Sequence, residues 1–234
     1  MRFNRFLYSV PCAVALLFTP ATTQAAIIDL STAACAGTSC GPLDAVGLID
    51  LTLTSQGGNF EYKSFNGETG LGVSGQTGGE IDLRESIDGL FTGPVNFDAF
   101  RVLFIYNGPE FGDPNEIAQV SINGGASVGT LTVGPLDNQA VWSLAGATVF
   151  NCGDTTTDGT GCFIVANPFG NVAVSSFSFT ALNAPGGTNN NSDYSLSTLS
   201  VSPDRTVFSS PEPASLLLFG TALLGYAARR RRVA

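Results

Sequence analysis

Apolar residues recur in short runs through the middle of this chain, and glycine, asparagine, aspartate and proline separate the runs. This punctuation is typical of β-strands joined by turns. Outside the two ends, no long stretch keeps the period of an amphipathic helix. We therefore predict an all-β fold, a two-sheet β-sandwich or jelly roll. The predicted strands are Val46–Thr54, Asn59–Phe65, Val95–Tyr106, Ile117–Ile122, Ser127–Val133, Ala140–Phe150, Cys162–Val165, Val172–Leu182 and Tyr194–Val201.

Two local patterns refine this prediction. Alternation within the strand at 172–182 places Phe177, Phe179 and Ala181 on one face. The run Asn123-Gly124-Gly125 lies between two strands and predicts a hairpin turn. The polar run at 185–192 is predicted to be an exposed loop.

The first 25 residues have the pattern of a secretory signal helix. Arg2 and Arg5 form a positive start, an apolar core follows from Phe6 to Phe18, and small residues precede Ala26. We predict that signal peptidase cleaves between Ala25 and Ala26.

The last 24 residues form a second targeting pattern. Pro211-Glu212-Pro213 is expected to be extended, because each proline disfavours helix at the residue before it. An uncharged apolar run follows at 214–228, shorter than the roughly 20 residues of a full span. The run predicts a short hydrophobic helix. Four arginines then favour the cytoplasmic side of a membrane: Arg229, Arg230, Arg231 and Arg232.

These three parts, in this order, closely resemble the PEP-CTERM sorting signal of exported proteins from Gram-negative bacteria. The resemblance implies that the membrane protease exosortase recognises the tail and removes it near Pro211–Pro213. It also implies an inner-membrane precursor, a mature form at the cell surface or in the extracellular matrix, and an association with exopolysaccharide and biofilm. An ordinary single-pass tail anchor is the alternative.

A second resemblance lies inside the chain. The segment Gly70–Gly75, followed by Gly79-Glu80-Ile81-Asp82 and Glu85, looks like one that recurs in the β-sandwich ectodomains of PEP-CTERM proteins. There it reads as a glycine-rich turn followed by acidic residues before a strand. The resemblance implies a fold and no activity.

The chain thus divides into a signal peptide at 1–25, an ectodomain at 26–201, a linker at 202–210 and a sorting signal at 211–234. The part from 26 to 210 holds 18 of the 19 acidic residues but only four of the ten basic ones. Such an acidic surface repels nucleic acid, whose binding needs clustered lysine and arginine. It favours solubility and can attract divalent cations.

Four cysteines remain after the signal peptide, and an even number in an exported chain predicts disulfides. Three pairings exist, and proximity in sequence favours Cys35–Cys40 and Cys152–Cys162. A zinc site is disfavoured, because the chain has no C-x-x-C spacing and no histidine.

The absence of histidine also removes Ser-His-Asp and Cys-His catalysis, so we expect a non-enzymatic protein without a required cofactor. Glycoside hydrolysis through paired carboxylates is the enzymatic alternative. Its candidates are two clusters of acids: Glu80, Asp82 and Glu85, and Glu110, Asp113 and Glu116.

Calcium is the possible ligand with the best support. Asp154 and Asp158 precede Gly159 at the spacing of the first half of a D-x-D-x-D-G loop, although Thr156 and Val165 replace two ligands of an EF-hand. The competing interpretation is a polar loop closed by a disulfide. Glu80, Asp82 and Glu85 are a second calcium candidate.

A lectin-like, calcium-dependent module for exopolysaccharide is the alternative function. Its sugar-stacking candidates are Phe60, Tyr62, Phe65, Tyr106, Trp142 and Tyr194. Phenylalanine in alternating strands is more often core, which favours a plain structural domain.

Overall fold

A computed structural model of the chain describes residues 25–108, 115–156, 158–183 and 192–204. These residues form strands and connections and contain no helix, so none of them forms a helix able to cross a membrane. All strand pairs are antiparallel. The strands are β1 (Ala26–Asp29), β2 (Ser39–Val46), β3 (Ile49–Gln56), β4 (Phe60–Phe65), β5 (Glu68–Val73), β6 (Ser86–Leu103), β7 (Ile117–Ile122), β8 (Ser127–Val133), β9 (Ala140–Trp142), β10 (Thr148–Asn151), β11 (Phe163–Ala166), β12 (Ala173–Ala181) and β13 (Ser195–Pro203).

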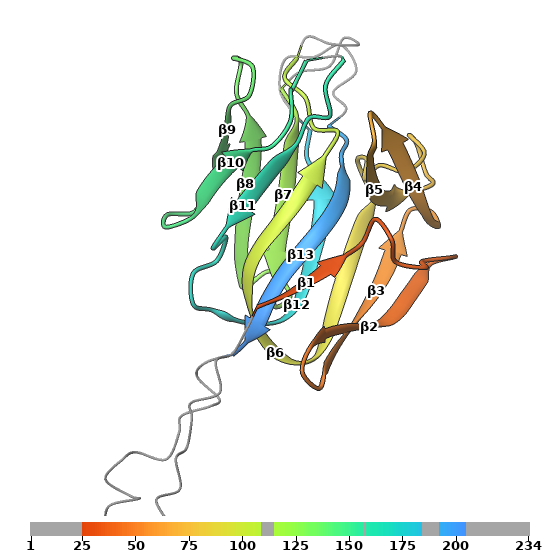
Figure 1. Cartoon of the computed structure of the whole chain (residues 1–234), viewed down its shortest axis with the longest axis vertical. Helices are drawn as coiled ribbons and strands as arrows, with labels where there is room; N and C mark the ends of the chain where they lie inside the picture. Colours follow the sequence, from red (N-terminus) through yellow and green to blue (C-terminus); the bar gives the residue numbers. More distant parts are fainter. Residues whose placement is uncertain (1–24, 109–114, 157, 184–191, 205–234) are drawn as a thin grey trace, which may run out of the picture.

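The long strand β6 joins two branches of one sheet (Figure 1). Its first half pairs with β3 and β12, and the branch continues through β2 on one side and through β7, β8 and β9 on the other. Its second half pairs with β11 and β13, and that branch continues through β10 and through β5 and β4. Strand β1 also pairs with β13.

The partners of β6 change around Gly93-Pro94. Pairing with β3 runs as far as Phe91, and pairing with β13 begins at Val95. Proline has no backbone N–H to give to a neighbouring strand, so a break in the hydrogen-bond ladder at this point costs little. A single strand can therefore serve both branches.

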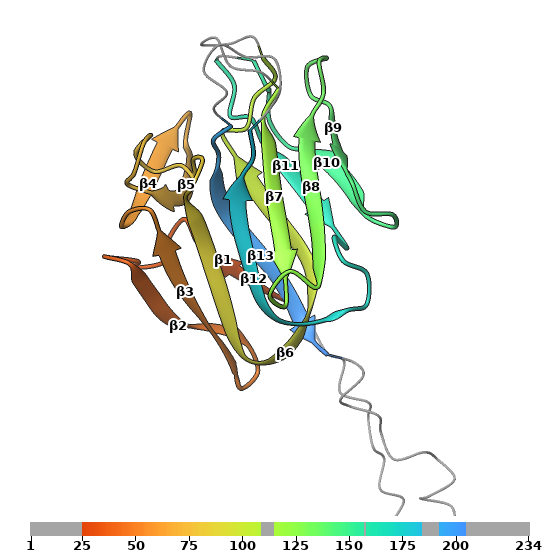
Figure 2. The same cartoon turned by 180° about the vertical axis from the view of Figure 1, so that it is seen from behind.

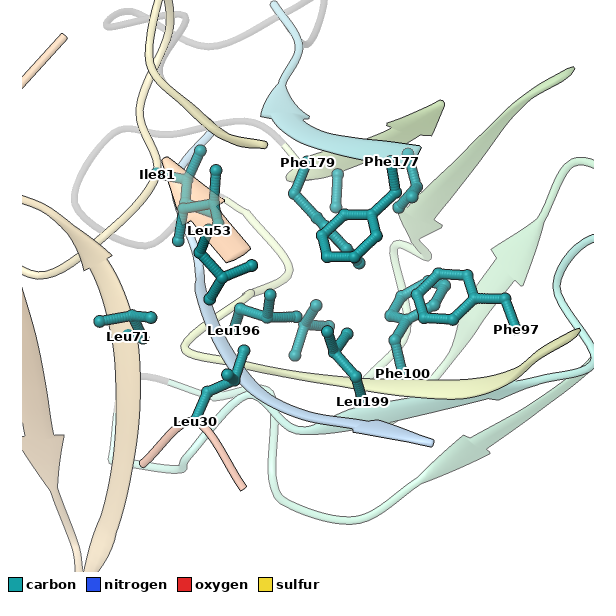
Figure 3. Packing of buried hydrophobic residues seen from close by; sticks show 14 of the residues in the cluster. Leu30, Leu53, Leu71, Ile81, Phe97, Phe100, Phe177, Phe179, Leu196 and Leu199 are labelled. Atoms are coloured by element: carbon teal, nitrogen blue, oxygen red, sulfur yellow. The ribbon is translucent and has the colours of Figure 1, made fainter. Parts of the chain in front are cut away.

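Aromatic side chains from the two halves of β6 and from β12 fill the core (Figure 3). Phe97 lies 5.6 Å from Phe177 and Phe100 lies 5.2 Å from Phe179, measured between ring centroids. Trp142 packs edge-on against Phe100 and donates its Nε1–H to the Pro168 carbonyl at 2.9 Å. Each large ring buries much apolar surface, so this cluster contributes heavily to stability.

The structure confirms the all-β prediction and several strands in detail. Strands β7 and β8 have the predicted bounds, and Asn123-Gly124-Gly125 forms the turn between them, all three with positive φ. Phe177, Phe179 and Ala181 are buried together on β12, as the alternation predicts.

Other local predictions were wrong or incomplete. The sequence around Gly70 is strand β5 rather than a turn, and the predicted strand Ala140–Phe150 is two strands separated by a turn at 143–147. The first half of β6 escaped prediction, because Gly89, Gly93 and Pro94 resemble a loop. Strict alternation along 172–182 would place Val174 on the face opposite Phe177, yet both are buried, because the register shifts between Val174 and Ser176. Strands β1 and β2 were also not predicted.

The predicted signal helix at 1–24, the loop at 185–191, most of the linker and the C-terminal helix lie outside the described residues.

Candidate functional site

The acidic segment singled out in the sequence is the connection between β5 and β6, residues 74–85, called here the acidic connection. It folds back against both its neighbours. Val73 N–H donates to the Glu80 carbonyl at 2.8 Å, and Ile81 N–H donates to the Tyr194 carbonyl at 2.7 Å. The connection is therefore held between β5 and the start of β13.

Its glycines allow these close approaches. A Cβ on Gly72 would overlap the backbone of Gly79, and one on Gly70 would overlap the Ser195 side chain. Gly79 has a φ of +82°, and a Cβ there would lie 2.6 Å from the backbone nitrogen of Lys63. Glycine is needed where a neighbouring backbone comes so near. The spacing of the glycines is thus set by close packing. It explains why Gly70 and Gly72 lie in a strand, β5, against which the acidic connection packs tightly.

Each of the three acids of the connection has a partner within the protein. Glu80 forms an ion pair with Lys63, with Oε1 and Nζ 2.6 Å apart. Asp82 Oδ2 accepts the Thr77 N–H at 2.6 Å. The two carboxylate oxygens of Glu85 accept the N–H groups of Gln76 at 2.9 Å and of Asp82 at 3.0 Å. Charged acceptors of backbone N–H groups give strong hydrogen bonds, so the acids hold the loop in shape.

Burial changes the acidity of two of them. Desolvation raises the pKa of Glu80 above its ordinary value of 4.5; the Lys63 ammonium lowers it and the Asp82 carboxylate adds to the rise. Desolvation also raises the pKa of Glu85, although the N–H groups of Asp82 and Gln76 favour its ionised form. The folded state therefore binds protons at these groups more tightly than the unfolded chain does.

The arrangement is unsuited to the chemistry considered for these acids. The exposed fractions of Glu80, Asp82 and Glu85 are 1%, 0% and 5%. Carboxylates that cleave a glycosidic bond must face the sugar, and these three are covered by protein. Within the described ranges, no three acidic or cysteine side chains lie close enough together to hold a metal ion. The burial and contacts of these three carboxylates fit a structural role.

The second acidic cluster is described only in part. Glu116 is buried, and its Oε2 accepts the Tyr106 N–H at 2.5 Å. Glu110 and Asp113 lie outside the described residues.

Both disulfides pair as proximity predicted. Cys35 bonds to Cys40 and Cys152 bonds to Cys162. Inside the second loop, Asp154 accepts the Thr156 N–H at 3.1 Å through Oδ1, and its own carbonyl accepts the Gly161 N–H at 2.7 Å. The side chains of Asp154 and Asp158 are exposed. A polar loop closed by a disulfide accounts for these contacts.

Half of the aromatic residues considered for sugar stacking belong to the core. Tyr194, Trp142 and Phe60 are buried, so their rings have no free face for a ligand. Tyr62 and Tyr106 are half-buried, and Phe65 is 39% exposed. The structure does not gather the six into one binding face.

A different region, which the sequence did not single out, is open. A cavity of about 390 Å³, called here the outer groove, is lined by residues of β3, β6, β12 and β7 and of the turn after β7. These four strands are neighbours in the first branch of the sheet (Figure 2). Its lining consists of Thr52, Thr54, Asp88, Gly89, Leu90, Ser121, Gly124, Ser176, Phe177 and Ser178. Serines and threonines at alternate strand positions were the only sequence signal for it, and that signal is common in exposed strands.

Comparison with known proteins identifies the C-terminal end of the chain. Residues 211–232 match the PEP-CTERM protein-sorting motif. This motif marks an exported protein with a membrane-anchored precursor that exosortase processes. No curated protein and no solved structure is significantly similar to the chain. The matched residues lie outside those that the structure describes.

Proposed function

We propose that this chain is a non-enzymatic β-sandwich protein that exosortase releases to the cell surface or extracellular matrix of a Gram-negative bacterium. The match of residues 211–232 to the sorting motif is the observation that carries the proposal. A signal peptide cleaved between Ala25 and Ala26 would start export, and the short apolar run with its four arginines would hold the precursor until cleavage.

The described domain supports an extracellular location. Disulfides form and persist in oxidising compartments, and each of the two closes a short loop of the chain. The excess of acidic residues keeps the released domain soluble. Attachment to biofilm polysaccharide is the role we propose for the mature form.

The absence of an enzymatic role is likewise a proposal. It is supported by the lack of histidine in the chain and by the burial of Glu80, Asp82 and Glu85. Both remove the side chains that would otherwise be the first candidates for acid–base catalysis.

A second candidate function is carbohydrate binding, and the outer groove favours it, because the groove is open and lined with hydroxyl groups. Carbohydrate binding by the outer groove does not require the aromatic stacking face expected of a lectin. Calcium dependence through Asp154 and Asp158 stays a hypothesis, and thermal unfolding with calcium or with a chelator tests it. A rise of the unfolding temperature in calcium supports it, and identical curves contradict it.

Replacing both prolines of the motif tests the main proposal. In cells that make exosortase, a Pro211→Ala/Pro213→Ala variant should accumulate as a membrane-bound precursor, while a Ser210→Ala variant next to the motif should be processed normally. Cell fractionation followed by immunoblotting measures this. Normal processing of the double variant would contradict the proposal.

A further inference from the structure

The outer groove has a regular geometry set by strand register. One row across the four strands consists of Thr54, Asp88, Ser178 and Ser121, each opposite the next. Neighbouring strands lie about 4.8 Å apart, so this row spans about 14 Å. A second row contains Thr52, Leu90 and Ser176. The rows offer an elongated, shallow surface with an acid in one and an apolar side chain in the other.

The hydroxyl groups in these rows form no hydrogen bond with any described residue of the protein. They belong to Thr52, Thr54, Ser121, Ser176 and Ser178. Elsewhere such groups are used: Ser55 Oγ donates to the Gly58 carbonyl and Ser195 Oγ to the Gly79 carbonyl.

Asp88 lies between the hydroxyls with half of its carboxylate available. Its Oδ2 accepts the Ser86 hydroxyl at 3.0 Å and the Gln56 amide at 3.3 Å. Within the described part of the chain, Oδ1 has no partner. The two contacts fix the orientation of the carboxylate, and because Asp88 lines the groove, its second oxygen is available there as a strong acceptor.

Several classes of partner do not fit this surface. The strands beneath it are paired on both sides, so a peptide cannot add as a further strand. None of the described residues that line the groove is a lysine or an arginine, which disfavours nucleic acid, anionic polysaccharide and anionic lipid. Among the described lining residues, Leu90, 62% exposed, is the one exposed large apolar side chain, too little for a hydrophobic protein interface.

We propose that the outer groove binds a neutral polysaccharide chain. The hydroxyls of the two rows and Asp88 Oδ1 exchange hydrogen bonds with sugar hydroxyls, and Leu90 packs against the apolar face of a sugar ring. The volume of about 390 Å³ lies in the range of ligand pockets. The inference rests on the proposed extracellular location, where such a chain would be the matrix itself.

Calorimetric titration of the exported protein, purified from its producing cells, tests the inference. The probes are three neutral hexasaccharides (cello-, manno- and xylohexaose) and oligogalacturonate as an anionic counterpart. At least one neutral probe should bind with a dissociation constant of about 1 mM or tighter. Oligogalacturonate should not bind.

Three variants locate the binding. Ser178→Trp fills the groove and should weaken binding at least about tenfold, and Asp88→Ala should weaken it by about threefold to tenfold. Thr132→Trp is the matched control: it puts the same side chain on β8 of the same branch, outside the lining, and should leave affinity unchanged. Thermal unfolding of each variant checks that it folds. If Ser178→Trp does not fold, the affinity of Asp88→Ala still tests the inference.

Absence of binding to all three neutral probes would overturn the inference. So would unchanged affinity in Asp88→Ala and any folded Ser178→Trp variant, or preference for oligogalacturonate. None of these results touches the proposed export and sorting, which fail only if fractionation shows an unprocessed chain.

Discussion

The acidic connection leads into β6 and the outer groove crosses the same strand, and the two regions use their polar groups in opposite ways. In the connection, Glu80, Asp82 and Glu85 are buried and each has an ion-pair or hydrogen-bond partner within the protein. In the groove, the hydroxyls are open and unpaired within the described chain. Charged residues that are clustered in sequence can therefore have a structural role, while serines and threonines form the accessible surface.

The same contrast applies to mutation. A change in the connection disturbs close backbone contacts and buried charge, so it should lower the free energy of unfolding. Removing a groove hydroxyl, such as that of Thr54 or Ser178, breaks no hydrogen bond within the described chain, so it should leave that free energy almost unaltered and act on binding alone.

The largest effect is expected for Gly72→Ala. The new Cβ would overlap the Gly79 backbone, so the cover over β5 must move, at a cost of about 4 kcal/mol in the free energy of unfolding. Gly93→Ala is the control, because its Cβ would meet Ile49 only at an ordinary 3.5 Å. Urea unfolding measures both, and equal midpoints would contradict the tight packing described here.

Lys63→Met should come next, at about 3 kcal/mol near neutral pH, because it leaves the buried Glu80 carboxylate without its cation. The pKa of Glu80 is already raised, so its protonated form is favoured in the folded state. The loss should therefore shrink as the pH falls toward the ordinary value of 4.5 and grow as it rises.

The double variant Lys63→Met/Glu80→Gln sharpens this test. It removes the charge together with its partner, so most of the lost stability should return and its pH dependence should flatten. Urea unfolding over a pH series checks both. Equal losses for the single and the double variant at every pH would show that Glu80 does not carry a buried charge.

The smallest effects belong to the groove. Thr54→Val and Ser178→Ala should each change the free energy of unfolding by less than about 0.5 kcal/mol, because their hydroxyls bond to no described residue. Chemical unfolding measures this beside the connection variants. A loss of 2 kcal/mol or more in either would place the groove among the structural regions.

The fold class and many strands could be predicted, because alternation and turn residues are local signals. The turn at Asn123 and the buried pair Phe177 and Phe179 are examples. Strand β5 and the first half of β6 could not, since Gly70 and Gly89 are required by contacts with Ser195 and Phe177, which are distant in sequence.

The candidate sites divide in the same manner. Both disulfides followed from proximity along the chain. The roles of Glu80 and Glu85 depended on burial, and the groove depended on the register of four strands. Neither burial nor register can be read from spacing alone. The sorting motif was recognisable because all its parts lie together at 211–232.

The proposed function depends on export followed by removal of the tail. The intact mass of the protein, recovered from fractionated cells with and without exosortase, shows whether both steps occur. We predict an extracellular form that starts at Ala26, ends near Pro211–Pro213 and retains both disulfides, and a membrane-bound form with its tail when exosortase is absent. A single cytoplasmic species that runs from Met1 through Arg232 in both strains would contradict the claim.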